Sequence, residues 1–155
     1  MQNIRQLASK FRRAIENAKN EGAFSGDQMF RNFPQGCCGI TSELLARFLI
    51  DNDIKIKLTY VCGTYRDPSF ELPSHAWLKI NKNTVIDITG DQFKYYPEPL
   101  YFNEAIYVGP YTDFYNLFET NVEEICDNYF PLIDNYIRNY ISRKKLYEII
   151  LKYIN

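Results

Sequence analysis

FPQGCCGITSELLARFL (residues 33–49) sets two adjacent cysteines, Cys37 and Cys38, after a proline and a glycine and directly before an apolar run. The apolar residues of that run recur at helical spacing, which predicts a helix from about Cys38 to Ile50. A helix N-terminus carries unpaired backbone N–H groups and the positive end of the helix dipole. Both favour a thiolate over a thiol, so either cysteine is a candidate nucleophile.

A nucleophilic cysteine needs a base and a group that orients this base, and the chain contains a single histidine, His75. His75 begins HAWLKI (residues 75–80), and Asp87 lies in TVIDIT (residues 84–89). Both segments are short, rich in apolar residues and separated by the turn-forming NKN, so we predict two antiparallel strands.

The expected pairing of these strands brings the histidine to the aspartate. We predict that Lys79 faces Asn83 across the turn, which places His75 directly opposite Asp87 on the same face of the sheet. A shift of one residue would separate them onto opposite faces. In the predicted register, the carboxylate holds the imidazole in one tautomer and stabilises its charged form.

The remaining pattern predicts an α+β domain. Apolar residues at helical spacing predict a helix over residues 1–20, and alternating residues predict strands over 54–65 and 104–109. Helical spacing returns over about 112–155, where Pro131 is expected to break the helix. The resulting order of two helices, several antiparallel strands and further helices is typical of α+β proteins.

Composition excludes several classes of function. Basic and acidic residues are interspersed and the net charge is −1, which gives no basic surface for nucleic acid. No apolar run reaches the roughly 20 residues of a membrane-spanning helix, and the N-terminus lacks a secretory signal, so we expect a cytoplasmic protein. With one histidine and no CxxC pair, we predict no metal and no cofactor. In a reducing compartment we expect all four cysteines to be free: Cys37, Cys38, Cys62 and Cys126.

Three segments together resemble the transglutaminase-like branch of the papain-like cysteine enzymes. GCCGITSELL resembles that family's Gly-x-Cys-x-x-x-[Ala/Ser]-x-Leu-Leu helix start, HAWLKI its His-Ala-Trp strand, and VIDIT its Asp-x-Thr strand. The residues that match are Gly36, Cys38, Ser42, Leu44, Leu45, His75, Ala76, Trp77, Asp87 and Thr89. The chain departs from the family where Ile88 replaces the usual proline after the aspartate, and where Cys37 precedes the nucleophile.

The resemblance implies a fold and an activity. It implies one catalytic domain over residues 1–155, with a papain-like core over about 33–110 in which the nucleophile begins a helix packed on an antiparallel sheet. It also implies a Cys38–His75–Asp87 triad that forms a thioester on a peptide or protein amide. Hydrolysis of this thioester would make the protein a peptidase, an amidase or a glutamine deamidase, as in similar compact bacterial effectors. Transfer to an amine would make it a transglutaminase or acyltransferase.

Several assignments stay open from the residues alone. The family pattern selects Cys38 over Cys37, and Asp91 competes with Asp87 as the group that orients the histidine. Four amide side chains are candidates for holding the oxyanion: Gln28, Asn32, Gln35 and Gln92.

A different class of function is a catalytically silent domain that binds a protein partner. Tyrosine is enriched at protein interfaces, and the C-terminal region, expected to be helical, is rich in it. The tyrosines concerned are Tyr129, Tyr136, Tyr140, Tyr147 and Tyr153.

Overall fold

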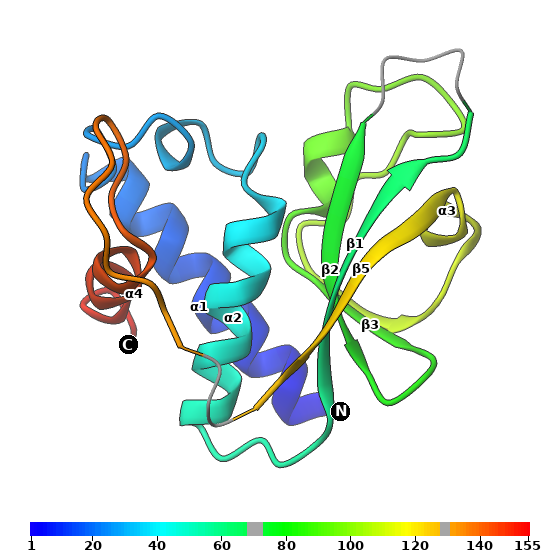
Figure 1. Ribbon diagram of the computed structural model, residues 1–155, viewed down its shortest axis with the longest axis horizontal. Coiled ribbons are helices and arrows are strands. Elements are labelled where there is room, and N and C mark those ends of the chain that lie inside the picture. The colour runs from blue at the N-terminus through cyan, green and yellow to red at the C-terminus, as the bar shows by residue number, and fades with distance from the viewer. Residues whose placement is uncertain (68–72, 128–130) are drawn as a thin grey trace.

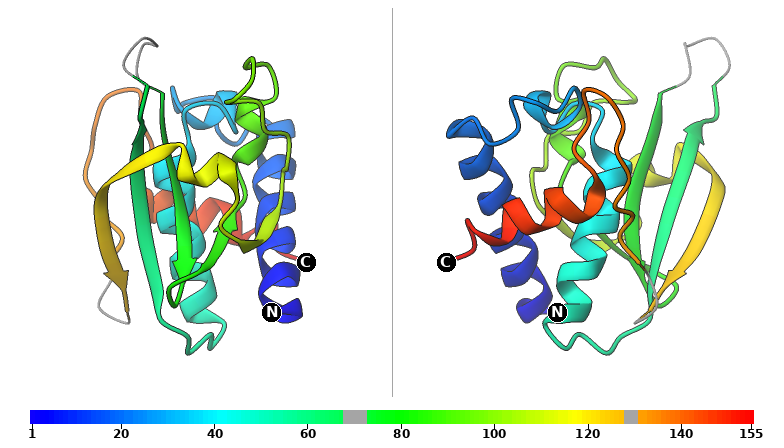
Figure 2. Two further views of the ribbon diagram at one scale, coloured as in Figure 1. Left: turned by 90° about the vertical axis from the view of Figure 1, so that its right-hand side faces the viewer. Right: turned by 60° about the vertical axis from the view of Figure 1, so that its left-hand side comes forward.

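The structure, a computed structural model, describes residues 1–67, 73–127 and 131–155, and it has two layers. Helices α1, α2 and α4 gather on one side of the molecule, and a five-stranded antiparallel sheet lies on the other (Figures 1 and 2). The α+β class predicted from the sequence is therefore confirmed. The helices are α1 (Gln2–Asn20), α2 (Cys38–Asp51), α3 (Asp113–Asn116) and α4 (Arg143–Leu151), with short 3-10 turns η1 (Phe30–Asn32) and η2 (Gly90–Phe93). The strands are β1 (Leu58–Tyr65), β2 (Ser74–Ile80), β3 (Thr84–Asp87), β4 (Tyr107–Pro110) and β5 (Phe118–Cys126).

Helices α1 and α2 form because each has an apolar face to bury. In α1 this face includes Ile4, Phe11 and Ile15, and in α2 it includes Leu44 and Leu49. All five side chains are buried in one core with the inner face of the sheet. Burial of side chains of this size stabilises a fold by roughly 1.5–3 kcal/mol each. The helices predicted over residues 1–20 and from Cys38 to Ile50 are confirmed.

The sheet has the order β4-β3-β2-β1-β5, and each neighbouring pair is antiparallel. Successive residues of β2 point to opposite faces. Leu78 and Ile80 join the core shared with the helices, whereas Trp77 joins a second, aromatic cluster. His75 lies on the same face as Trp77, so the sheet directs the histidine into the aromatic cluster.

The predicted register of β2 and β3 is wrong by two residues. Lys79 pairs with Val85, and not with Asn83, because all three residues of NKN form the turn. His75 therefore does not lie directly opposite Asp87, but two positions along from it. A shift of two leaves every side chain on its original face, because side chains alternate with a period of two. The two side chains still share a face and meet diagonally.

The helical region predicted over about 112–155 is wrong for most of its described length. Only α3 and α4 are helical there, and Phe118–Cys126 is strand β5, paired along the whole of β1. An unpaired edge of β1 would leave buried backbone groups unsatisfied, and pairing outweighs the weak helical pattern. The strand predicted over 54–65 begins only at Leu58, because both of its partner strands end opposite that residue.

Two further observations concern the tyrosines and the membrane. Tyr136 and Tyr140 lie outside helices, Tyr147 is buried in α4, and Tyr153 follows that helix. Tyr129 lies outside the described residues. Within the parts of the chain that the structure describes, no helix combines the length and the apolar character needed to cross a membrane.

Candidate active site

Cys37 and Cys38 differ in burial, although they are neighbours. Cys37 is fully buried in the core, and its Sγ donates to the carbonyl oxygens of Met29 and Gln35, at 3.2 and 3.4 Å. Burial raises the pKa of the Cys37 thiol to about 12, with a smaller contribution from Asp27. A thiol of this kind stays protonated at neutral pH and is unreactive. Cys37 is a packing residue.

Cys38 is the first residue of α2 and is partly exposed. Burial alone would raise the pKa of its thiol. A hydrogen bond to His75 and the charge of that imidazole oppose this effect, together with a hydrogen bond to the backbone of Ala76, and the pKa of Cys38 is lowered. Cys38, and not Cys37, therefore has the electrostatic environment of a nucleophile.

His75 is fully buried between Cys38 and Asp87. Its Nε2 lies 2.7 Å from Oδ2 of Asp87, which leaves Nδ1 for the thiol. Burial disfavours the imidazolium, but the charge and hydrogen bond of Asp87 and the contact with Cys38 outweigh burial and raise the pKa of His75 to about 9. The thiolate of Cys38 and the imidazolium of His75 therefore stabilise each other.

Asp87 is held by four hydrogen bonds, and all come from groups that are themselves buried. Its Oδ2 accepts from His75 and from the hydroxyl of Tyr115, at 2.7 and 2.9 Å. Its Oδ1 accepts from the backbone N–H and the hydroxyl of Thr89, at 2.8 and 3.1 Å. Burial would raise the pKa of Asp87, but His75, Thr89 and Tyr115 lower it. In this chain, the spacing of Asp87 and Thr89 lets the threonine hold the carboxylate from two residues away.

Asp91, the alternative orienting carboxylate, binds elsewhere. Both of its oxygens accept from Arg12 of α1, each at 2.8 Å. The structure thus brings Asp87 to the histidine and places Asp91 in a separate ion pair.

An aromatic box surrounds the imidazole. Five ring centroids lie 5.0–6.3 Å from that of His75, and they belong to Trp77, Phe93, Phe114, Tyr115 and Phe118. Such packing keeps water from the buried charges and fixes the ring plane. The sequence pattern did not predict Tyr115 as a site residue, because its place depends on α3 and β5, which were expected to be one long helix.

One of the four candidate amides contacts His75. Nε2 of Gln92 lies 3.2 Å from Nδ1 of His75, close to where the thiol is bound. Gln35 instead donates to the backbone oxygen of Gln92, and Gln28 accepts from Tyr140. Asn32 is exposed. Of the four candidate amides, Gln92 is therefore the one that contacts the histidine.

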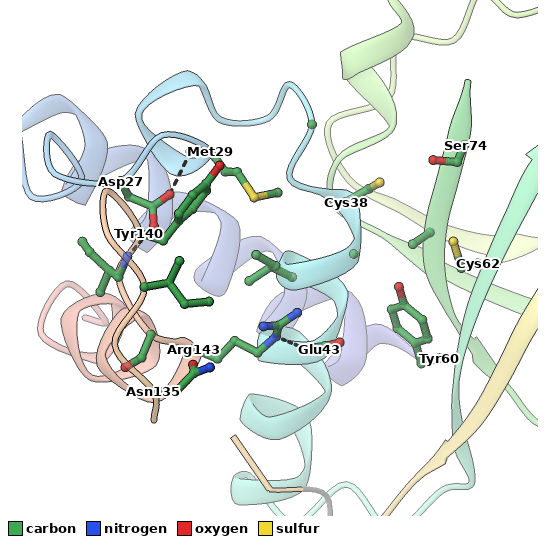
Figure 3. A pocket seen from close by; sticks show the side chains of 17 residues that line it. Asp27, Met29, Cys38, Glu43, Tyr60, Cys62, Ser74, Asn135, Tyr140 and Arg143 are labelled. Carbon is green, nitrogen blue, oxygen red and sulfur yellow. Dashed lines mark hydrogen bonds and ion pairs between the residues drawn. The ribbon is translucent and has the colours of Figure 1, made fainter. Parts of the chain in front are cut away.

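Cys38 opens into a cleft of about 500 Å³, shown in Figure 3. One wall is α2, a second is formed by β1 and β2, and a third by residues 135–143. An ion pair between Glu43 of α2 and Arg143 links the first wall to the third. The lining is mixed, with apolar side chains from Met29, Ile40, Ile137, Tyr140 and Ile141, and polar ones from Tyr60, Cys62 and Ser74.

Asp27 fixes the C-terminal wall of this cleft. One carboxylate oxygen accepts from the backbone N–H groups of Met29 and Phe30, and the other accepts from that of Ile141, all at 2.8–2.9 Å. The cleft is therefore built from segments far apart in the sequence, tied together through one buried carboxylate.

The described residues contain no group of three or more His, Cys, Asp or Glu side chains arranged to hold a metal ion. No family model, no curated protein and no solved structure matches the chain.

Proposed function

We propose that the protein is a cysteine-dependent enzyme of transglutaminase-like type that hydrolyses an amide or acyl bond. The observation that carries this proposal is the buried sequence of contacts from Cys38 through His75 to Asp87. Binding alone requires no thiol, imidazole and carboxylate in that order. The order of thiol helix, histidine strand and aspartate strand along the chain supports the family assignment.

In the proposed reaction, the Cys38 thiolate attacks the carbonyl carbon, and a C–S bond forms as the carbonyl electrons move to oxygen. The imidazolium of His75 then donates its Nδ1 proton to the leaving nitrogen as the C–N bond breaks, and a thioester remains. His75, now neutral, accepts a proton from water as the water oxygen attacks. The C–S bond breaks, and the acid is released with Cys38 again a thiolate.

The oxyanion formed in both steps needs hydrogen-bond donors. The first backbone N–H groups of α2 have no partner within the helix and point toward its N-terminal end, where Cys38 lies. The side chain of Gln92 is the second proposed donor, because it already contacts the imidazole beside the thiol. The atom of Gln92 that faces Nδ1 is the amide nitrogen, a hydrogen-bond donor, and the same N–H₂ group would donate to the oxyanion.

The cleft supports a polypeptide amide as the substrate, either in the backbone or in a glutamine side chain. Its volume of about 500 Å³ is within the usual range for ligand sites. It extends past Cys38 between walls that carry both apolar and polar side chains, which suits a peptide segment. Water as the acceptor gives a peptidase, amidase or deamidase, and an amine acceptor gives a transglutaminase or acyltransferase.

A binding function is the second candidate, favoured by one observation. The segment before α4 exposes large side chains, among them Tyr136, which is 89% exposed, and Ile133 and Ile137, each 53% exposed. Exposed aromatic and aliphatic groups so close together are typical of contact surfaces. They would serve a partner whether or not the triad is active.

The deciding experiment measures alkylation of each cysteine by iodoacetamide, site by site, at pH 6.5. We expect Cys38 to react much faster than the other three and Cys38→Ser to remove the fast phase. Cys62→Ser is the matched control, because Cys62 lines the same cleft but burial raises the pKa of its thiol. Equal rates at Cys38 and Cys62 would contradict the enzyme proposal.

A further inference from the structure

Residues 87–93 supply three of the side chains that contact the imidazole: Asp87, Gln92 and Phe93. Asp87 and Gln92 contact the two ring nitrogens, and Thr89 holds Asp87. Phe93 packs edge-on against the ring, with centroids 5.0 Å apart. Only the first residue of this segment belongs to a β-strand, so the sheet alone does not fix the position of Gln92.

Arg12 of α1 forms hydrogen bonds with two residues of this segment, Ile88 and Asp91. Its Nη1 donates to the backbone oxygen of Ile88 at 2.6 Å, and its Nη1 and Nη2 donate to the two oxygens of Asp91, each at 2.8 Å. Ile88 follows Asp87, and Asp91 precedes Gln92. One guanidinium therefore bonds the chain neighbours of both Asp87 and Gln92.

The Arg12 side chain also contacts the loop that precedes Cys38. The Arg12 guanidinium lies over the ring of Phe33, 4.8 Å from its centroid, and Phe33 belongs to the loop that leads into Cys38. Gln35, from the same loop, donates to the backbone oxygen of Gln92 at 3.2 Å. Arg12 therefore contacts both the segment that holds His75, residues 87–93, and the loop that leads into Cys38.

We propose that Arg12 is a positioning residue, which sets the placement of Asp87 and Gln92 on His75 through its contacts with Ile88 and Asp91. This inference rests on the proposed function. It assigns a role in the site to α1, a helix outside the segments that resemble a known family.

The chemistry of the contact suits positioning. Arg12 is only 6% exposed, and its Nε also donates to Glu16 at 2.6 Å, so the guanidinium has partners on every nitrogen. A planar fork with two parallel bonds to a carboxylate fixes direction as well as distance. Buried ion pairs add little net stability compared with apolar residues of similar size, so stability alone gives no reason for this one.

The test compares Arg12→Lys and the double variant Arg12→Met/Asp91→Leu with the wild type. The double variant removes both charges together, so neither is left buried and unpaired. Arg12→Lys keeps the positive charge but loses the two parallel hydrogen bonds of the guanidinium to Asp91. It still tests the proposal if the double variant fails to fold. Arg5→Met is the matched control, because Arg5 lies on the same helix and donates to the backbone oxygen of Val108, the β4 partner of Ile86, but makes no hydrogen bond to residues 87–93.

The readout is the pH profile of Cys38 alkylation, with the thermal midpoint measured in parallel. If His75 loses its placement, the apparent pKa of Cys38 rises toward that of a free thiol. Its rate at pH 6.5 then falls about tenfold for each unit of that rise. We expect a fall of at least about tenfold in both Arg12 variants and none in Arg5→Met.

Each remaining outcome has a definite meaning. An unchanged pH profile in a folded double variant would overturn the positioning role while the proposed function stands. Unfolding of both Arg12 variants would show that the contact serves folding and would also overturn it. A wild-type Cys38 with the profile of a free thiol would overturn the proposed function, and the inference with it.

Discussion

Replacing Asp87 by asparagine should abolish turnover and leave the fold intact. The amide oxygen can still accept from Thr89, but the amide N–H₂ then faces Nε2 of His75 and the hydroxyl of Tyr115, where Oδ2 accepted two hydrogen bonds. The imidazole is then favoured in the tautomer that accepts at Nε2 and carries its proton on Nδ1. The nitrogen beside the thiol has no lone pair left to act as a base.

The structure also gives the size of the effect. The pKa of His75 rises from 6.5 to about 9 although burial opposes the rise, which corresponds to roughly 3 kcal/mol in favour of the imidazolium. Without the carboxylate, the largest contribution that opposes burial is lost, so we expect the pKa of His75 to fall. The counter-charge of the thiolate is then weakened, and turnover should fall by about 10⁴.

The assay is turnover of any substrate found by screening peptide amides, with Cys38 alkylation against pH as a measure that needs no substrate. Circular dichroism reports the fold. Asp51→Asn is a suitable control, because Asp51 also accepts a tyrosine hydroxyl, that of Tyr147 at 2.7 Å, but lies at the opposite end of α2 from Cys38. Turnover of folded Asp87→Asn within tenfold of wild type would refute the assigned role of the carboxylate.

Three other predictions follow from the same contacts. Tyr115→Phe removes one donor from Asp87, so the pKa of that carboxyl should rise and turnover should fall about tenfold, measured by steady-state kinetics; an unchanged rate would count against a supporting role. Gln92→Ala should lower kcat about 10²-fold, whereas Gln35→Ala should leave it nearly unchanged, and the reverse result would move the oxyanion donor to Gln35. The lowered pKa of Asp87 adds stability that is present above the ordinary value of about 3.9 and is lost as pH falls through the lower folded value. Urea unfolding at pH 7 and pH 2 should therefore show a smaller loss on acidification for Asp87→Asn than for wild type.

Cys38, His75 and Asp87, the residues of the proposed triad, could be selected from the sequence because each lies in a short local pattern. The apolar spacing after Cys38 predicts the helix, and the turn between β2 and β3 limits the choice of register. The predicted pairing of Lys79 with Asn83 was wrong by two positions. Because a shift by an even number of residues leaves each side chain on its face, His75 and Asp87 still share one face of the sheet. A shift by one residue would have placed the two side chains on opposite faces.

The supports of the site are non-local, and no local pattern indicates them. Strand β5 depends on the free edge of β1, and Tyr115 reaches Asp87 only because α3 and β5 fold back over the sheet. In the sequence, Arg12 is an ordinary polar position of an amphipathic helix. Its contacts with residues 88–91 exist only because α1 packs against that segment in the folded chain. Secondary-structure propensity describes what an isolated segment prefers. For residues 118–126, pairing with β1 determined that the segment is a strand.

The arrangement of donors around the triad follows from its charge. A thiolate, an imidazolium and a carboxylate carry one net negative charge, and two of these three side chains, His75 and Asp87, are fully buried. Two features offset this charge: the hydrogen bonds of Thr89 and Tyr115 to Asp87, and the N-terminus of α2 at Cys38. Asp91 is a second carboxylate in the segment that follows β3, and the ion pair with Arg12 neutralises its charge. In the proposed arrangement, Arg12 therefore both positions residues 87–93 and neutralises the second carboxylate of that segment.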